Sequence, residues 1–87
     1  MPTKTKSATV RQHVHLTFPE NLINEPVLSR LAKQFDVDFN IRGSTVTSDL
    51  ALVALEIDGR DKEVAKAIAW LRARGISVEP MERKTLE

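Results

Sequence analysis

The 87-residue chain contains no cysteine and no tyrosine, and it has only one tryptophan and three phenylalanines. The lack of cysteine excludes disulfide bonds, iron–sulfur clusters, thiolate catalysis and the usual structural zinc sites. The longest apolar run, from Leu50 to Leu55, is far too short to span a membrane. The first residues carry lysines but lead into no apolar segment of a signal peptide. We therefore expect a cytoplasmic protein with no membrane insertion, no metal and no cofactor.

An excess of charge of either sign is also absent. The formal net charge is +1, and residues 9–81 carry nine Lys or Arg and ten Asp or Glu, so this region is close to neutral. Binding to a phosphate backbone requires a basic surface, which this composition does not supply. The expected outward positions of the first and third strands also lack the aromatic side chains on which RNA bases stack. The sequence therefore argues against a nucleic-acid partner.

Apolar residues recur with the periods of strands and helices along most of the chain. Alternation with a period of two predicts half-buried strands, and apolar residues three and four apart predict amphipathic helices. Gly43 is expected to bend or bulge the second strand, and Gly75 to end the second helix as a left-handed cap. The pattern indicates a strand over 9–18, a helix over 26–36, strands over 37–46 and 50–57, a helix over 60–74 and a short strand over 76–80.

The order strand–helix–strand–strand–helix–strand determines the fold class. Both strand–helix–strand crossovers are right-handed, so both helices pack on the same face of one sheet. We predict a ferredoxin-like α+β fold (βαββαβ), with one four-stranded antiparallel sheet and two helices on one face. The folded domain is expected over residues 9–81, between disordered tails at 1–8 and 82–87. A domain this small is only marginally stable alone, which favours self-association.

The sheet face opposite the helices is expected to contact a partner. Its residues form neither a uniformly polar surface nor a core, and a mixed exposed face of this kind is typical of an interaction surface. We place the interface with a second copy at His13, His15, Leu52 and Ala54. The two histidines alone do not make a metal site, because no third ligand is tied to them by spacing.

No motif in the sequence indicates catalysis. The aspartates fall at expected strand and helix ends, where aspartate caps helices and forms turns. The serines lack a glycine elbow, and Gly43 is not followed by the lysine and second glycine of a phosphate-binding loop. We therefore expect a protein that is not an enzyme.

Three segments together resemble a known family. They are Pro19 to Phe35, Val37-Asp38-Phe39-Asn40-Ile41, and Lys66-Ala67-Ile68-Ala69-Trp70-Leu71 followed by Gly75-Ile76-Ser77-Val78-Glu79. Across nearly all of residues 9–81 the chain is similar to the NIL domain, a small ferredoxin-like, ACT-related module found at the C-terminus of the ATPase subunit of methionine ABC importers. The resemblance implies a regulatory domain that pairs with its twin and binds L-methionine near the paired interface.

The asparagine and isoleucine of the family's name motif fall on Asn40 and Ile41, whereas Arg42 replaces the leucine. Asn40 offers a donor and an acceptor to an amino-acid ligand, and the Arg42 guanidinium can clamp a carboxylate. The segment before the first helix offers apolar side chains and free backbone N–H groups. The ligand-binding residues expected from the resemblance are Leu22, Ile23, Asn24, Asn40, Ile41 and Arg42.

Two functions from different classes therefore remain open. The first is a stand-alone homodimeric module that binds an amino acid, methionine being favoured, and reports its level to another protein. The second is a ligand-free adaptor that docks on a partner protein of sulfur amino-acid metabolism or of an ABC importer. In the adaptor, the open sheet face contacts the partner and the Asn40–Arg42 strand has only a structural role. The near-neutral charge disfavours a third class, a nucleic-acid module.

Overall fold

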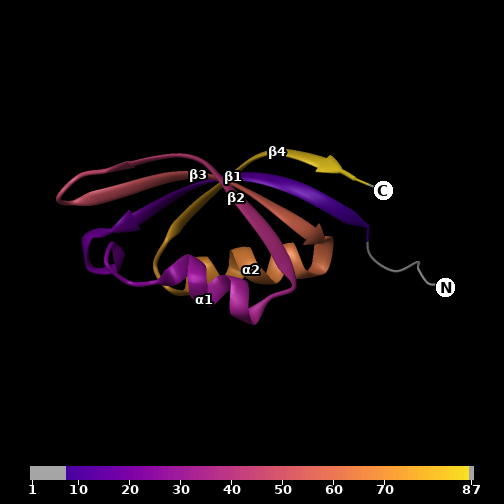
Figure 1. Cartoon of the computed structure of the whole chain (residues 1–87), viewed down its shortest axis with the longest axis horizontal. Coiled ribbons are helices and arrows are strands. Elements are labelled where there is room, and N and C mark those ends of the chain that lie inside the picture. The colour runs from indigo at the N-terminus through magenta and orange to yellow at the C-terminus, as the bar shows by residue number, and fades with distance from the viewer. Residues whose placement is uncertain (1–7, 87) are drawn as a thin grey trace.

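The computed structural model describes residues 8–86 of the chain. Its four strands form one antiparallel sheet in the order β2-β3-β1-β4. Both helices lie on one side of this sheet (Figure 1). The structure thus confirms the ferredoxin-like α+β fold. The elements are β1 (Thr9–Pro19), the short 3-10 turn η1 (Glu20–Leu22), α1 (Val27–Gln34), β2 (Val37–Val46), β3 (Leu50–Arg60), α2 (Asp61–Ala73) and β4 (Ser77–Thr85).

The core lies between the two helices and the inner face of the sheet. Every second residue of β1 from Val10 to Phe18 is buried, as its alternating pattern predicts. Leu31 of α1, Ile57 of β3 and Leu71 of α2 are fully buried. Each such aliphatic side chain contributes about 1.5–3 kcal/mol relative to an exposed one. These contacts fix the two helices against the central strands β1 and β3.

The end of α2 follows the glycine-capped pattern expected from the sequence. Gly75 has φ = 96°, a conformation that side-chain-bearing residues rarely adopt. The N–H of Gly75 donates to the carbonyl of Arg72, and the N–H of Ile76 donates to the carbonyl of Leu71. These bonds satisfy the last carbonyls of the helix and turn the chain back into the core, where Ile76 is buried.

Strand β4 is longer than the sequence pattern predicts. It continues to Thr85, which pairs with Val10 of β1. The predicted domain end at residue 81 and the disordered tail from residue 82 are therefore wrong for residues 82–85. The residues of this edge strand are exposed on both faces beyond Val78, so no apolar alternation marks them. Residues 1–7 and 87 of the predicted tails lie outside the described residues.

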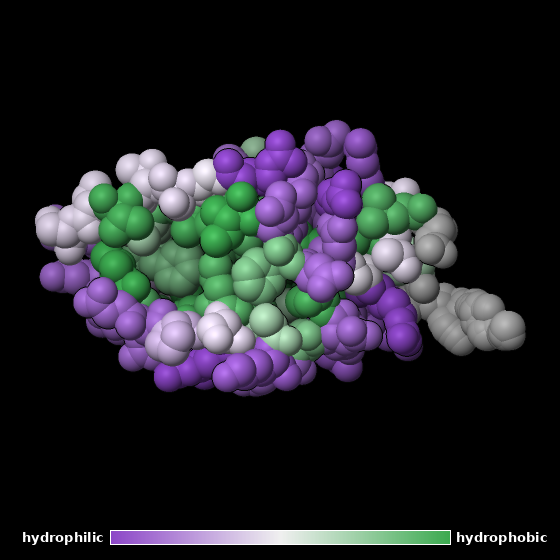
Figure 2. All heavy atoms as spheres, in the orientation of Figure 1, coloured by the Kyte–Doolittle hydropathy of each residue, from purple (hydrophilic) through white to green (hydrophobic). Residues whose placement is uncertain are grey.

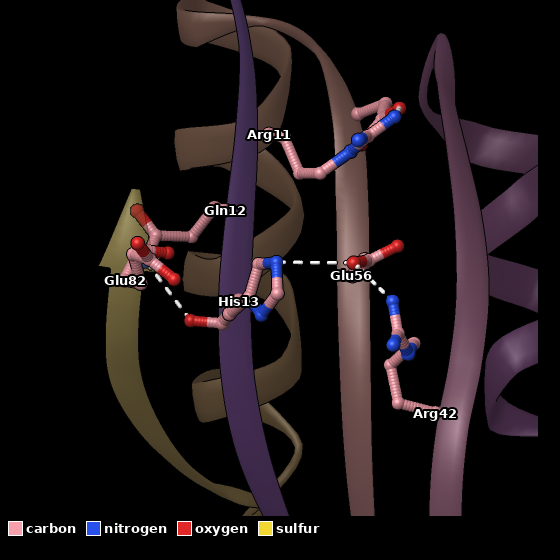
Figure 3. Close-up of polar contacts among 7 residues, drawn as sticks. Arg11, Gln12, His13, Arg42, Glu56 and Glu82 are labelled. Carbon is pink, nitrogen blue, oxygen red and sulfur yellow. Dashed lines mark hydrogen bonds and ion pairs between the residues drawn. The ribbon is translucent and has the colours of Figure 1, made fainter. Parts of the chain in front are cut away.

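A β-bulge lets β4 continue along β1. The register shifts between Gln12 and Val14, which pair with Arg83 and Pro80. The Gln12 side chain is buried, and Figure 3 shows it beside His13 and Glu82. Its amide nitrogen donates to the carbonyls of His13, Met81 and Glu82 at 2.9, 3.4 and 3.4 Å. The side-chain amide thereby bonds to carbonyl groups at the interrupted part of the ladder.

The hairpin formed by β2 and β3 projects beyond the helices (Figure 1). Helix α1 has eight residues, whereas β2 has ten and β3 eleven. A helix of eight residues is about 12 Å long, and a strand of ten residues is about 33 Å long. The expected bulge is present, because the register shifts between Ile41 and Gly43. Ile41, Val46, Leu50 and Leu52, all on this hairpin, are large apolar side chains left exposed.

Gly59 of β3 provides a test of the close approach between β3 and the start of β2. A Cβ atom there would lie 3.0 Å from Cγ1 of Val37 and 3.1 Å from the carbonyl oxygen of Asp36. Gly59→Ala should therefore lower the free energy of unfolding by about 1–3 kcal/mol, measured by urea denaturation. Gly43→Ala is the control, because its Cβ would meet no atom within 4 Å. Equal losses in the two variants would contradict this packing.

Candidate functional site

An apolar hollow lies under the β2–β3 hairpin, next to the start of α1. It has a volume of about 300 Å³. Figure 2 shows apolar side chains gathered on this face of the molecule. Apolar walls with a few polar groups are typical of sites for small molecules. The hollow is lined by the apolar residues Phe18, Ile23, Pro26, Val27, Leu28, Ile41, Val46, Ala51 and Val53, and by the polar residues Glu25 and Ser44.

The first turn of α1 places backbone donors at the rim of this hollow. The helix begins at Val27 without a side-chain cap, because Pro26 stands at the N-cap position. The Val27 N–H donates to the carbonyl of Glu25, and the Arg30 N–H donates to the carbonyl of Pro26. The N–H groups of Leu28 and Ser29 lie between them in the turn whose donors lack partners within the helix. The rim thus offers hydrogen-bond donors and the Glu25 carboxylate, which pairs with Arg30 at 3.0 Å.

The open face of the sheet carries a polar network instead. Glu56 of β3 is only 8% exposed, although no helix covers this face. Its Oε2 atom lies 3.0 Å from Nε2 of His13 on β1 and 2.8 Å from Nη1 of Arg42 on β2 (Figure 3). One carboxylate therefore ties three strands together. Nη1 of Arg42 donates a hydrogen bond to this oxygen, so the carboxylate has a charged partner despite its burial.

A second ion pair on the same face joins β1 and β3. Nε and Nη2 of Arg11 donate to the two carboxylate oxygens of Asp58 at 2.9 and 2.8 Å. The hydrogen bond from Arg11 and the charge of its guanidinium lower the pKa of Asp58, against a smaller opposing effect of burial. The same bond raises the pKa of Arg11. This bidentate geometry is the strong form of an arginine–carboxylate contact.

The four predicted interface residues share the open face. His13 lies opposite Glu56, His15 opposite Ala54, and Leu52 opposite Thr17. Leu52 is 45% exposed, so this apolar side chain is available to a partner. Within residues 8–86, no three histidine or carboxylate side chains come together in a way that could hold a metal ion. The homodimer role of these four residues stays a prediction.

The structure divides the six predicted ligand-binding residues between different places. Ile23 and Ile41 line the hollow. Leu22 is buried in the core, and Asn24 is exposed in the turn before α1. Asn40 faces the other side of the sheet, where it lines a polar recess of about 170 Å³. Arg42 lies on the same face of the sheet as Asn40, where it binds Glu56. Consecutive strand residues point to opposite faces, so Asn40 and Ile41 cannot contact one small ligand on one face.

Several residues of the hollow were not singled out from the sequence. Val46 and Ser44 of β2 join Ile41 there, because their partners in β3, Ala51 and Val53, point inward. The sequence does contain one signal for the hollow. The predicted strands are longer than the predicted helices can cover, so part of the inner face of the sheet must stay uncovered. The sequence pattern also gives no sign of the role of Gln12, because that role depends on a bulge that apolar alternation does not reveal.

Residues 12–80 of the chain match the family model of the NIL domain. The chain belongs to the NIL domain family. The methionine import ATP-binding protein MetN of Streptomyces griseus is 28% identical over 85 residues, which cover 93% of this chain and 24% of that protein. MetN of Protochlamydia amoebophila is 34% identical over 73 residues, covering 76% of this chain and 20% of that protein. This NIL domain therefore spans about a quarter of the length of the curated relatives it matches.

A solved structure supports the fold of this NIL domain. The de novo designed protein Foldit4 superposes with a TM-score of 0.60 over 91% of this chain and 99% of its own, at 13% sequence identity. At this identity the likeness concerns the fold alone. No helix within residues 8–86 is both long enough and apolar enough to cross a membrane.

The Arg11–Asp58 pair predicts acid-sensitive stability. The pKa of Asp58 is lowered in the folded state, so its contribution is fully present above the unfolded pKa of about 3.9 and is lost as the pH falls through the folded pKa. Asp58→Asn should lower stability at pH 7 by less than about 1 kcal/mol, because the pair is partly exposed. Asp58→Asn should also make the free energy of unfolding depend less steeply on pH below pH 4, as measured by urea denaturation at a series of pH values. An unchanged acid slope would contradict this contribution.

Proposed function

We propose that this NIL domain is a cytoplasmic regulatory module, not an enzyme, which binds methionine in the hollow near an interface with a second copy. The observation that carries the proposal is the apolar hollow with hydrogen-bond donors at its rim. The family membership supports the choice of ligand, because the relatives are methionine import ATP-binding proteins. Catalysis has no support in either observation.

Methionine suits the chemistry of the hollow. Its thioether side chain is flexible and apolar, and it fits a wall of Ile23, Leu28, Ile41 and Val46. The free N–H groups and the positive end of α1 favour the ligand carboxylate. Glu25 can accept hydrogen bonds from the ligand ammonium group, and the Ser44 hydroxyl can help. An amino acid with a charged side chain would leave that charge unpaired against the apolar wall, which disfavours its binding.

Ligand binding would also cover exposed apolar surface of the hairpin. Ile41 is 50% exposed and Val46 is 61% exposed, and both line the hollow. Burial of this surface from water supplies a driving force for ligand binding. Strand β2 lies at the edge of the sheet. A ligand bound against its inner face would therefore lie close to a second copy that contacts this edge. In this proposal, methionine occupancy is thereby reported to the assembly.

Thermal unfolding with a panel of amino acids tests the proposal. A ligand present at 100 times its dissociation constant stabilises the folded state by about 2.7 kcal/mol, which raises the melting temperature by several degrees in a domain of this size. We expect this shift with methionine and none with lysine or glutamate. The absence of a shift with every amino acid at millimolar concentration would overturn ligand binding.

Two neighbouring variants locate the ligand. Ile41→Ser changes the hollow and should abolish the methionine shift, whereas Asn40→Ala changes the open face and should preserve it. Both side chains are exposed, so both variants should fold. The opposite pattern, with loss only in Asn40→Ala, would place the ligand on the open face and contradict the proposed site.

A ligand-free adaptor is the second candidate function. The observation that favours it is the exposure of the apolar side chains Leu52 and Met81. Ion pairs between neighbouring strands hold the open face around them in place. A rigid surface of this kind can dock on a partner protein without a ligand. If no amino acid stabilises the domain, the adaptor is the function that remains.

A further inference from the structure

A trough crosses the open face of the sheet, on the side opposite the helices and the hollow. It consists of two adjoining cavities of about 550 and 370 Å³, which share His15 and Ala54. This open-face trough follows one row of paired residues across the four strands, which are Gly43, Ala54, His15 and Glu79. No atom lies within 4 Å of the position that a Cβ atom of Gly43 would take. The small residues Gly43 and Ala54 therefore leave room above the strands for a ligand.

Arg42 supplies positive charge at one end of the open-face trough. It is the unpaired residue of the bulge between Ile41 and Gly43, and a bulge can redirect a side chain. Its Nη1 atom donates to Glu56 of β3 at 2.8 Å, so the guanidinium lies over β3. The side chain remains 58% exposed, and a guanidinium has five N–H donors. Arg42 can therefore bind a further carboxylate without releasing Glu56.

The other end of the open-face trough carries negative charge. Glu79 and Glu82 of β4 are both exposed, and both line the trough. In the part of the chain that the structure describes, neither carboxylate forms an ion pair. Figure 3 shows Glu82 and Arg42 on opposite sides of the contact between His13 and Glu56. A ligand with a carboxylate at one end and a cation at the other complements both ends.

The distance between the two ends determines the length of such a ligand. The guanidinium of Arg42 lies over β3, and β4 is two strand spacings away. Two spacings amount to about 10 Å. An extended peptide advances about 3.3–3.6 Å per residue, so about three residues cover this distance. A single amino acid carries both of its charges on one Cα atom and is too short to reach both ends.

The middle of the open-face trough suits a peptide backbone. The exposed imidazole of His15 has one donor and one acceptor when it is neutral, and a peptide group needs both. Leu52 and Met81 are 45% and 47% exposed and provide apolar contacts on either side. Thr17 and Thr45 add hydroxyl groups. These uncharged side chains impose no charge requirement on the middle of the ligand.

We infer that the open-face trough binds a short zwitterionic peptide of about three residues. Its C-terminal carboxylate is bound by Arg42, and its N-terminal ammonium group is bound by Glu79 and Glu82. Its backbone crosses the strands above His15 and Ala54. This site is independent of the one proposed for methionine, because the hollow lies on the other face of the sheet.

A titration of the full chain with trialanine, followed by amide NMR shifts, tests this inference. We expect shifts at His15, Thr17, Ala54 and Glu79. Acetylation of the peptide N-terminus and amidation of its C-terminus each remove one charged contact, so each should weaken binding at least about fivefold. Alanine and methionine should not produce these shifts, because they cannot reach both ends of the trough.

Two variants determine the orientation of the peptide. In Arg42→Gln, trialanine and its amide should bind equally, whereas N-terminal acetylation should still weaken binding. In the double variant Glu79→Gln and Glu82→Gln, the acetylated and free peptides should bind equally, whereas amidation should still weaken binding. Asp49→Asn, a charge removal at the hairpin tip, is the control and should bind all peptides like the unmodified chain.

Three results would overturn the inference. They are the absence of shifts with millimolar trialanine, equal binding of the free and end-blocked peptides, and the same open-face shifts with alanine alone. Arg42→Gln removes the contact with Glu56, so the folding of each variant is verified by circular dichroism. Glu79 and Glu82 are exposed, so their double variant keeps the test decisive. The methionine shift of each variant is measured separately, which distinguishes a failure of peptide binding from a failure of methionine binding.

Discussion

The length mismatch between the helices and the sheet determines the functional surfaces of this NIL domain. Helices α1 and α2 have eight and thirteen residues, and the β2 and β3 strands have ten and eleven. A residue advances about 1.5 Å along a helix and about 3.3 Å along a strand, so the helices cannot cover the whole inner face. The uncovered part is apolar, and it forms the hollow. The same mismatch leaves Ile41 and Val46 exposed on the inner face of the hairpin.

The fold could be predicted because local periodicity determines it. The alternation in β1 and the apolar stripes of the helices give the element order, and the handedness of the crossovers then gives the topology. The family membership was also evident from contiguous segments. The end of β4 was not predictable, because residues 82–85 are exposed on both faces and carry no apolar pattern.

The candidate site was only partly predictable, because it depends on contacts between distant residues. The resemblance identified Ile23 and Ile41, which line the hollow, but it grouped them with Asn40 and Arg42 on the other face. The register of β2 against β3 separates these residues, and that register includes a bulge. The link from Glu56 to both His13 and Arg42 likewise requires the three strands to be aligned, which spacing in the sequence does not give.

The two faces of β2 carry different groups of side chains. Ile41 lines the hollow, and Asp38 and Arg42 lie on the other face of the same strand. If methionine binding favours association with a second copy, as the proposed function requires, association strengthens methionine binding by the same factor. A methionine titration followed by amide NMR shifts tests the central claim most directly. The account predicts shifts at Ile23, Leu28, Ile41 and Val46; shifts confined to His13, Ala54 and Glu56, or none, would contradict it.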